Sequence, residues 1–323
     1  MTCPEPILGN LTFHDFQPPV ADVAREVLAG LRREQPVLHP KYLYDAHGSR
    51  LFEAITRQPE YYPTEAEKTL LHRIGPELPN LVPTNTLLAE PGAGNGEKAR
   101  LLLDYWQPRS YMPIEISHSE LLDAAQALAK DNPELAIHAV CADYTRPIVW
   151  PKETPPPRLV FFPGSTLGNF EPEEREPFIR RLRELAGDGG SLLVGVDLHK
   201  DSETLTAAYN DAAGYTAAFN KNMLHHLNEV LGAGFEPEHV EHFAFYNEQQ
   251  RRVEMHLRCL RDQRITINGE HLALAAGTTL HTENSYKFTR QELEALLEKA
   301  GFTMRHWWQT PHPAFGLCLA DAV

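Results

Sequence analysis

The apolar residues of this chain follow two spacings, which together predict alternating strands and helices through its middle. Short apolar runs have the length of buried strands, and the segments between them repeat apolar residues at helical spacing. The candidate strands are residues 86–89, 111–116, 136–141, 159–162 and 191–196, and the candidate helices are residues 97–106, 119–129 and 173–186. This alternation is typical of an α/β fold whose parallel sheet is covered by helices on both faces.

Beyond residue 199 the pattern is more varied. The candidate elements here are a helix at 204–226, strands at 242–246 and 253–258 joined by a hairpin at 247–250, a helix at 290–300 that Gly301 ends, and strands at 303–308 and 315–320. We expect the last two strands to complete the parallel sheet. The region between them and residue 200 then reads as an insertion.

The N-terminal region combines predicted helices at 21–33 and 51–56 with two unusual connecting segments. Residues 41–49 and 59–64 mix aromatic side chains with glycine and proline, which suggests a loop that closes over a ligand. We therefore predict two domains. The larger sheet domain spans 66–199 and 288–323, and a smaller α+β substrate-binding or lid domain is formed by 1–65 and 200–287.

Charge and composition narrow the class of partner. The 323 residues carry a formal net charge of −14, with 44 acidic against 30 basic side chains, which disfavours nucleic acid and anionic membrane surfaces. No apolar run approaches the roughly 18 residues of a membrane span, and the N-terminus has no secretory pattern. The four scattered cysteines and the 16 histidines form no recognisable ligand motif, so no metal site is predicted. We expect a cytoplasmic monomer that acts on a small molecule.

A glycine-rich segment carries the clearest chemical signal. Residues 90–96, Glu-Pro-Gly-Ala-Gly-Asn-Gly, follow a predicted strand and precede a predicted helix, which is the context of a nucleotide-binding loop. The spacing differs from the G-x-G-x-x-G of dinucleotide-binding loops. An anionic Glu90 at the strand end would repel a pyrophosphate and attract a cationic sulfonium. The pattern resembles motif I of the Rossmann-like methyltransferases, and this resemblance implies that Gly92 and Gly94 contact S-adenosylmethionine.

Further polar residues follow the next strands in the order that this cofactor requires. Glu115 ends the second strand, where an acid can accept both ribose hydroxyl protons. Asp143 and Tyr144 follow the third strand, where they can bind the adenine amino group and flank the ring. Gly164 begins the segment after the fourth strand, which would face the transferred methyl group. A nicotinamide-dependent oxidoreductase is the alternative that the glycine spacing disfavours.

The resemblance extends beyond the cofactor loop. From about residue 40 to 320 the chain is similar to the histidine Nα-methyltransferases of ergothioneine biosynthesis, which trimethylate the amino group of histidine. The blocks that carry this resemblance are residues 44–49, 59–65, 164–169, 209–214, 216–220 and 282–288. It implies a Rossmann-like methyltransferase sheet and S-adenosylmethionine as cofactor.

The same resemblance implies roles for individual residues. Tyr61, Asn169 and Tyr209 would hold the amino and carboxylate end of histidine. Glu283 and Ser285 would bind its imidazole, with Met255 packed beside the ring. The residues implied around the methylated nitrogen are Tyr44, Thr216 and Phe219, with Asn169, Tyr44 and Phe219 as the catalytic set. The cofactor set is Tyr44, Glu90, Gly92, Gly94, Lys98, Glu115, Asp143, Tyr144 and Gly164.

The chain departs from the family pattern at two places, and two other functions are compatible with its motifs. The family pattern has aspartate where this chain has Glu115, and the loop carries one extra glycine. A methyltransferase for another amino acid or small amine would share the fold and cofactor. A regulator that binds S-adenosylmethionine without turnover would share the loop. Glu283 favours histidine, because an apolar side chain would leave that carboxylate without a partner.

Overall fold

The computed structural model describes residues 5–16, 21–146 and 150–323. The chain divides into two compact units. The first comprises residues 1–18, 63–199 and 287–323, and the second comprises 19–62 and 200–286. Among the helices of the described residues, none is both long and apolar enough to cross a membrane.

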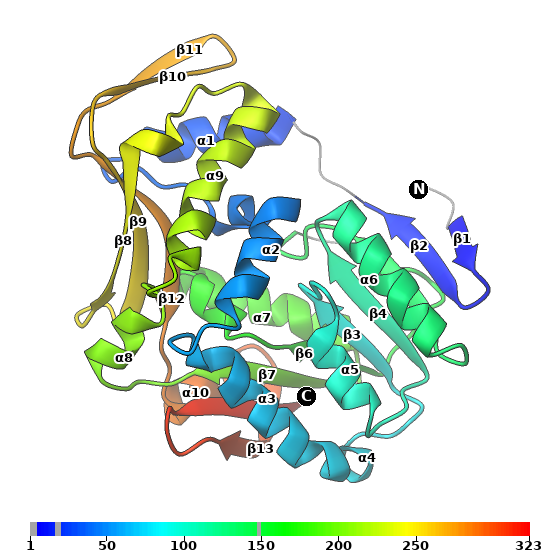
Figure 1. Ribbon diagram of the computed structural model, residues 1–323. Helices are drawn as coiled ribbons and strands as arrows, with labels where there is room; N and C mark the ends of the chain where they lie inside the picture. The colour runs from blue at the N-terminus through cyan, green and yellow to red at the C-terminus, as the bar shows by residue number, and fades with distance from the viewer. Residues whose placement is uncertain (1–4, 17–20, 147–149) are drawn as a thin grey trace. The chain divides into compact units, whose positions relative to one another are not determined.

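The first unit is built on a nine-stranded sheet (Figure 1). In spatial order its strands are β1 (Glu5–Leu8), β2 (Leu11–Asp15), β5 (Ala136–Cys141), β4 (Ser110–Glu115), β3 (Leu87–Pro91), β6 (Arg158–Phe162), β7 (Ser191–Asp197), β14 (Phe315–Ala322) and β13 (Phe302–Gln309). The five strands predicted in the middle of the chain are all present and parallel. The last two strands complete this sheet, as predicted, but β14 pairs antiparallel with both β7 and β13, so the expected parallel direction is wrong.

Helices cover both faces of this sheet, as predicted for the α/β fold class. They are α3 (Tyr62–Ile74), α4 (Leu78–Leu81), α5 (Glu97–Leu103), α6 (His118–Asp131), α7 (Pro172–Ala186) and α10 (Arg290–Lys299), with short 3-10 turns η2 (Gly75–Glu77) and η3 (Thr166–Asn169). Successive side chains of β6 show the two layers. Phe161 packs in the core formed with α3, α5 and α6, and Phe162 contacts Phe178 of α7 with ring centroids 5.1 Å apart.

The N-terminal strands belong to the first unit, although the predicted smaller domain includes residues 1–65. β2 pairs parallel with β5 in the large sheet, with Leu11 opposite Ile137. Leu11 and Phe13 are buried in the core of the first unit. The spacing of apolar residues can predict that a segment is a buried strand, but it does not predict which sheet that strand joins.

The second unit packs helices against a three-stranded antiparallel sheet, β12-β9-β8. Its elements are α1 (Ala21–Leu31), η1 (Pro40–Leu43), α2 (Ala46–Ile55), α8 (Ser202–Ala207), α9 (Tyr215–Leu231), η4 (Pro237–His239), β8 (Val240–Asn247), β9 (Arg252–Cys259), β10 (Gln263–Ile267), β11 (Glu270–Leu274) and β12 (Thr279–Tyr286). The predicted hairpin is β8–β9. β12 and the β10–β11 hairpin were not predicted.

Two helical predictions in this unit need correction. The helix expected over 204–226 is interrupted, because residues 208–214 form a turn that ends at Gly214 with φ +78°. The segment expected as a loop at 41–49 is largely helical. Asp45 caps α2 by accepting the N–H of Gly48 at 2.6 Å, so that helix begins at Ala46, before the predicted residue 51.

Candidate active site

The glycine loop connects β3 to α5 at the carboxyl edge of the first unit's sheet. Gly92, Gly94 and Gly96 have φ values of +72°, +52° and +70°, a region that side chains with a Cβ rarely adopt. A Cβ built on Gly92 would lie 3.4 Å from the ring of Tyr144, whereas one on Gly94 would meet no described atom within 4 Å. The loop therefore presents bare backbone to open space beside Tyr144.

Glu115 lies at the end of β4 with its carboxylate against this loop. Its two oxygens accept the N–H of Gly94 at 3.1 Å and that of Ile116 at 2.8 Å. Burial raises the pKa of Glu115 although these backbone hydrogen bonds oppose the rise. The sequence predicted that this acid and the glycine loop form one site, and both lie at the edge where ligands of such sheets bind.

Asp143 and Tyr144 follow β5 at the same edge. Asp143 Oδ1 accepts hydrogen bonds from the backbone and hydroxyl of Thr145, and Arg146 Nε lies 3.2 Å from Oδ2. Tyr144 contacts Phe162 edge to face and Phe178 at a tilted angle, with ring centroids 6.1 Å apart in each pair. The ring is thereby held beside Gly92.

The structure corrects the charge that we expected on Glu90. Its side chain is 1% exposed and accepts a 2.5 Å hydrogen bond from the Tyr111 hydroxyl. Burial raises the pKa of Glu90 from 4.5 to about 8, although Tyr111 and Lys98 oppose the rise. The carboxyl therefore carries a proton at neutral pH. The anion that we expected to attract a sulfonium is largely neutral in this environment.

Lys98 contacts an acid that sequence reasoning missed. Glu67 of α3 is fully buried, and its Oε2 lies 2.6 Å from Lys98 Nζ. The same carboxylate accepts the N–H of Gly164 at 2.9 Å. A Cβ on Gly195 would stand 1.9 Å from Glu67 Oε1, so a glycine on β7 makes room for this acid. Glu67 follows the predicted segment 59–64 closely, but nothing in its local pattern indicates burial.

The segment after β6 is anchored from β7. Ser165 has a left-handed φ of +56°, and its hydroxyl accepts the N–H of Asp197 at 2.8 Å. Asp197 in turn pairs with Lys287 at 2.9 Å, and both side chains are fully buried. These contacts fix the backbone that carries Gly164 and, at the end of η3, the half-buried Asn169.

In the second unit a row of aromatic rings brings four predicted residues together. Tyr44 meets Phe219 edge to face at 5.3 Å, and Tyr61 meets Tyr209 in the same way at 6.1 Å. Phe52, which the sequence analysis did not select, connects them by contacts to Tyr44, Tyr61 and Phe219 at 5.7, 6.0 and 5.8 Å. In the sequence, Phe52 lies at helical spacing in α2, as an ordinary core residue would.

The remaining predicted substrate residues lie on β9, β12 and α9. Glu283 is paired in register with Met255 and is 8% exposed. Two residues on, the Ser285 hydroxyl accepts a 2.7 Å hydrogen bond from Tyr209. The N–H of Thr216, in the first turn of α9, donates to Asp211 at 2.7 Å. This part of the second unit thus combines a buried carboxylate, a thioether and hydroxyl groups.

The predicted residues fall into one set in each unit. The first unit holds Glu90, Gly92, Gly94, Lys98, Glu115, Asp143, Tyr144, Gly164 and Asn169, and the second holds Tyr44, Tyr61, Tyr209, Thr216, Phe219, Met255, Glu283 and Ser285.

Known proteins similar to this chain agree with one another. The profile of a protein family described as histidine-specific, S-adenosylmethionine-dependent methyltransferases matches residues 23–322. The histidine N-alpha-methyltransferases of Mycolicibacterium smegmatis and Mycobacterium tuberculosis are 40% and 38% identical, each over 92% of this chain and 94% of the relative. Ergothioneine biosynthesis protein 1 of Neurospora crassa is 28% identical over 85% of this chain and 32% of that protein. The chain therefore belongs to the family of histidine-specific, S-adenosylmethionine-dependent methyltransferases.

Proposed function

We propose that this enzyme trimethylates the α-amino group of L-histidine, giving Nα,Nα,Nα-trimethylhistidine (hercynine), as the first step of ergothioneine biosynthesis. The observation that carries the substrate assignment is the buried Glu283, which lies opposite Met255 and two residues before Ser285. An imidazole offers N–H groups to that carboxylate and a flat face to the thioether. An aliphatic side chain has no donor to offer this buried carboxylate, and the lost hydrogen bond would cost about 1–3 kcal/mol or more.

We assign the cofactor to the carboxyl edge of the first unit's sheet. Its residues suit S-adenosylmethionine, because the bare backbone at Gly94 and the carboxylate of Glu115 offer polar contacts for the ribose and the amino acid part. Asp143 and Tyr144 would bind and flank the adenine. The other residues proposed for the cofactor are Glu90, Gly92, Lys98, Gly164 and, from the second unit, Tyr44. The second unit is proposed as the substrate-binding and lid domain.

In the proposed reaction the bound cofactor supplies an electrophilic methyl group. The chain's own residues position the amine for an in-line displacement and exclude water, which is where most of the catalysis arises. Tyr61, Asn169 and Tyr209 would hold the amino and carboxylate end, with the amine neutral when it attacks. Thr216 would line the space around the nitrogen.

Each methyl transfer breaks the bond between the methyl carbon and sulfur, which leaves as the thioether S-adenosylhomocysteine, and gives an ammonium that must lose a proton before the next transfer. The third transfer gives a quaternary ammonium, whose positive charge is permanent. Tyr44 and Phe219 already contact each other, and their aromatic faces can stabilise a quaternary ammonium by roughly 0.5–2 kcal/mol. We propose that these two residues with Asn169 form the catalytic set. We also propose that the enzyme is a monomer and works in the cytoplasm.

Mass spectrometry of the products tests this function. The purified chain is incubated with S-adenosylmethionine and an equimolar mixture of the common amino acids. Trimethylhistidine as the dominant product supports the proposal. Methylation of another amino acid would overturn the role of Glu283 while leaving the cofactor site in place. Thermal stabilisation by S-adenosylmethionine without any methylated product would favour a regulator.

A further inference from the structure

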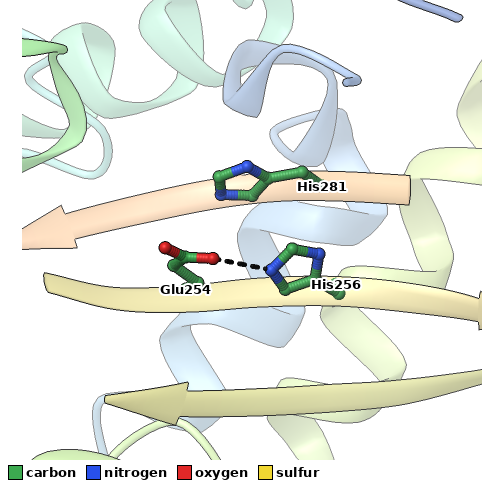
Figure 2. Close-up of side chains that lie close together, drawn as sticks. All are labelled: Glu254, His256 and His281. Carbon is green, nitrogen blue, oxygen red and sulfur yellow. Dashed lines mark hydrogen bonds and ion pairs between the residues drawn. The ribbon is translucent and has the colours of Figure 1, made fainter. Parts of the chain in front are cut away.

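Three ligand-type side chains that the proposed reaction does not use meet on the sheet of the second unit (Figure 2). Glu254 and His256 are two residues apart on β9, and His281 of β12 is directly opposite His256 in the antiparallel register. Residues i and i+2 of a strand project from the same face, and a directly opposed residue on the next strand joins them there. One ligand atom from each side chain lies within 4.8 Å of the other two.

This group, named here the back-face cluster, lies on the side of the sheet away from the hydrophobic core. Val253, Met255 and Leu257 of β9 pack into the core with α9, so the alternate residues Glu254 and His256 face the other way. Even so, the three cluster residues are only 6–9% exposed. They are shielded in part by one another, because the His256 and His281 rings stack at 4.5 Å.

Neighbouring donors hold the carboxylate of Glu254 in one orientation. Arg252 Nε and Asn247 Nδ2 hold Oε1 of Glu254 at 2.8 and 2.9 Å. The other oxygen, Oε2, is the one that faces His256 Nε2, at 3.0 Å.

We infer that the back-face cluster is a binding site for a divalent transition-metal ion of the Zn²⁺ class. Two imidazoles and one carboxylate are a donor set that Zn²⁺ prefers, and three protein ligands leave a position for water or another oxygen. Asn284 Oδ1, 2.8 Å from His281 Nε2, is such an oxygen beside the cluster. The ion replaces the hydrogen bond between His256 Nε2 and Glu254 and the hydrogen bond between His281 Nε2 and Asn284. His256 then carries its proton on Nδ1, which has no hydrogen-bond partner in the described structure.

An ion at this site would join β9 to β12 behind the proposed substrate pocket. Met255 lies between two of its ligands in sequence, and Glu283 follows the third by two residues. The strand register is irregular between His281 and Glu283, where the Thr282 hydroxyl donates to the carbonyl of Met255 at 3.0 Å. The site itself does not depend on the proposed function, since metal binding is measured without turnover.

The test uses the full, tag-free chain, stripped with EDTA and dialysed against Zn²⁺. Metal content by inductively coupled plasma mass spectrometry should reach about one Zn²⁺ per chain. Loss of a residue that only hydrogen-bonds to a metal ligand lowers metal affinity by roughly 10–100-fold. H256Q and H281Q each remove a ligand and should lower the affinity for Zn²⁺ by more than this. H225Q, which alters an exposed histidine on α9, should bind Zn²⁺ like the wild type.

Cobalt provides a second measurement that needs no variant. Co²⁺ added to the wild-type chain should give the intense visible absorption of a four- or five-coordinate site, and Zn²⁺ should abolish it. Absence of this band, or Zn²⁺ binding that H256Q and H281Q leave unchanged, would show that the cluster is a metal-free hydrogen-bond network. If a variant misfolds, the cobalt spectrum of the wild-type chain still shows whether the cluster binds a metal ion.

Discussion

Two buried glutamates show how their contacts set the charge of single residues in this protein. Burial favours the neutral form of both Glu90 and Glu254. The direct hydrogen-bond donor to Glu90 is the neutral Tyr111 hydroxyl, and the pKa rises to about 8. Glu254 accepts from the cationic Arg252 and from His256, and its pKa falls to about 2. Both side chains are buried, yet Glu90 is protonated at neutral pH and Glu254 is ionised.

Removal of the charge on Glu283 should weaken histidine binding. E283Q keeps an acceptor oxygen of similar size but loses a charged hydrogen bond to the imidazole, worth about 1.5–3 kcal/mol. The KM for histidine should rise by roughly 10- to 150-fold with a smaller change in kcat, because this contact is made equally before and during methyl transfer. Steady-state kinetics at saturating S-adenosylmethionine measures both. E229Q, an exposed glutamate on α9, is the control and should match the wild type.

At the scale of elements, the start of α9 is fixed by a side chain outside the helix. Asp211 accepts the N–H groups of Tyr215 and Thr216 at 2.8 and 2.7 Å, and Gly214 supplies the left-handed residue that ends the turn. Burial opposes the charge on Asp211, but hydrogen bonds from Thr216 and Tyr215 lower its pKa. The first turns of α9 carry Thr216 and Phe219, so this cap also positions part of the proposed site.

Loss of this cap should reduce stability and activity together. D211A leaves two N–H groups at the start of α9 without their acceptor, and the free energy of unfolding should fall by about 1–2 kcal/mol. T289A is the matched control, because Thr289 caps α10 in the first unit and accepts the N–H of Glu292. Urea unfolding and kcat/KM should show lower stability in both variants and lower activity in D211A alone. Equal activity in the two variants would contradict a positioning role for α9.

At the scale of the whole molecule, each unit has its own hydrophobic core. All four tryptophans, at positions 106, 150, 307 and 308, belong to the first unit. Trp106 is almost completely buried there. Tryptophan fluorescence therefore reports on unfolding of the unit that contains Glu90, separately from the other unit.

The buried Glu90 should make the stability of this unit depend on pH. Its pKa rises from 4.5 to about 8 on folding, so between these values the folded chain holds a proton that the unfolded chain releases. The stabilisation is complete below pH 4.5 and is lost as the pH rises, by about 1.4 kcal/mol per pH unit, until the pH passes about 8. E90Q carries no such proton.

The difference in urea midpoint between wild type and E90Q tests this dependence. Urea unfolding of both proteins is followed by tryptophan fluorescence from pH 5.5 to 8.5. The urea midpoint of the wild type should fall relative to that of E90Q up to about pH 8, and above that pH the two midpoints should change in parallel. Curves that remain parallel throughout would mean that Glu90 is ionised in the folded chain across this range.

The features that can be predicted from this sequence are those that a few adjacent residues encode. Each central strand is a short apolar run. Gly92, Glu115 and Asp143 each follow or end such a strand, which places them at the ligand-binding edge of the sheet. Glu67 and Phe52 were missed because their neighbours in sequence are not their neighbours in space. The roles of the individual residues in both sets stay predictions, and E283Q tests the one on which the substrate assignment depends.

Apolar spacing and motifs of a few adjacent residues were enough to predict the fold class, the family and the order of the central strands and helices. Contacts in the folded chain set the antiparallel direction of β14, the sheet that β2 joins and the break before α9. They also set the neutral state of Glu90 and brought together Glu254, His256 and His281. Strand partners, pKa values and ligand clusters depend on contacts between residues far apart in the chain, which local spacing does not encode.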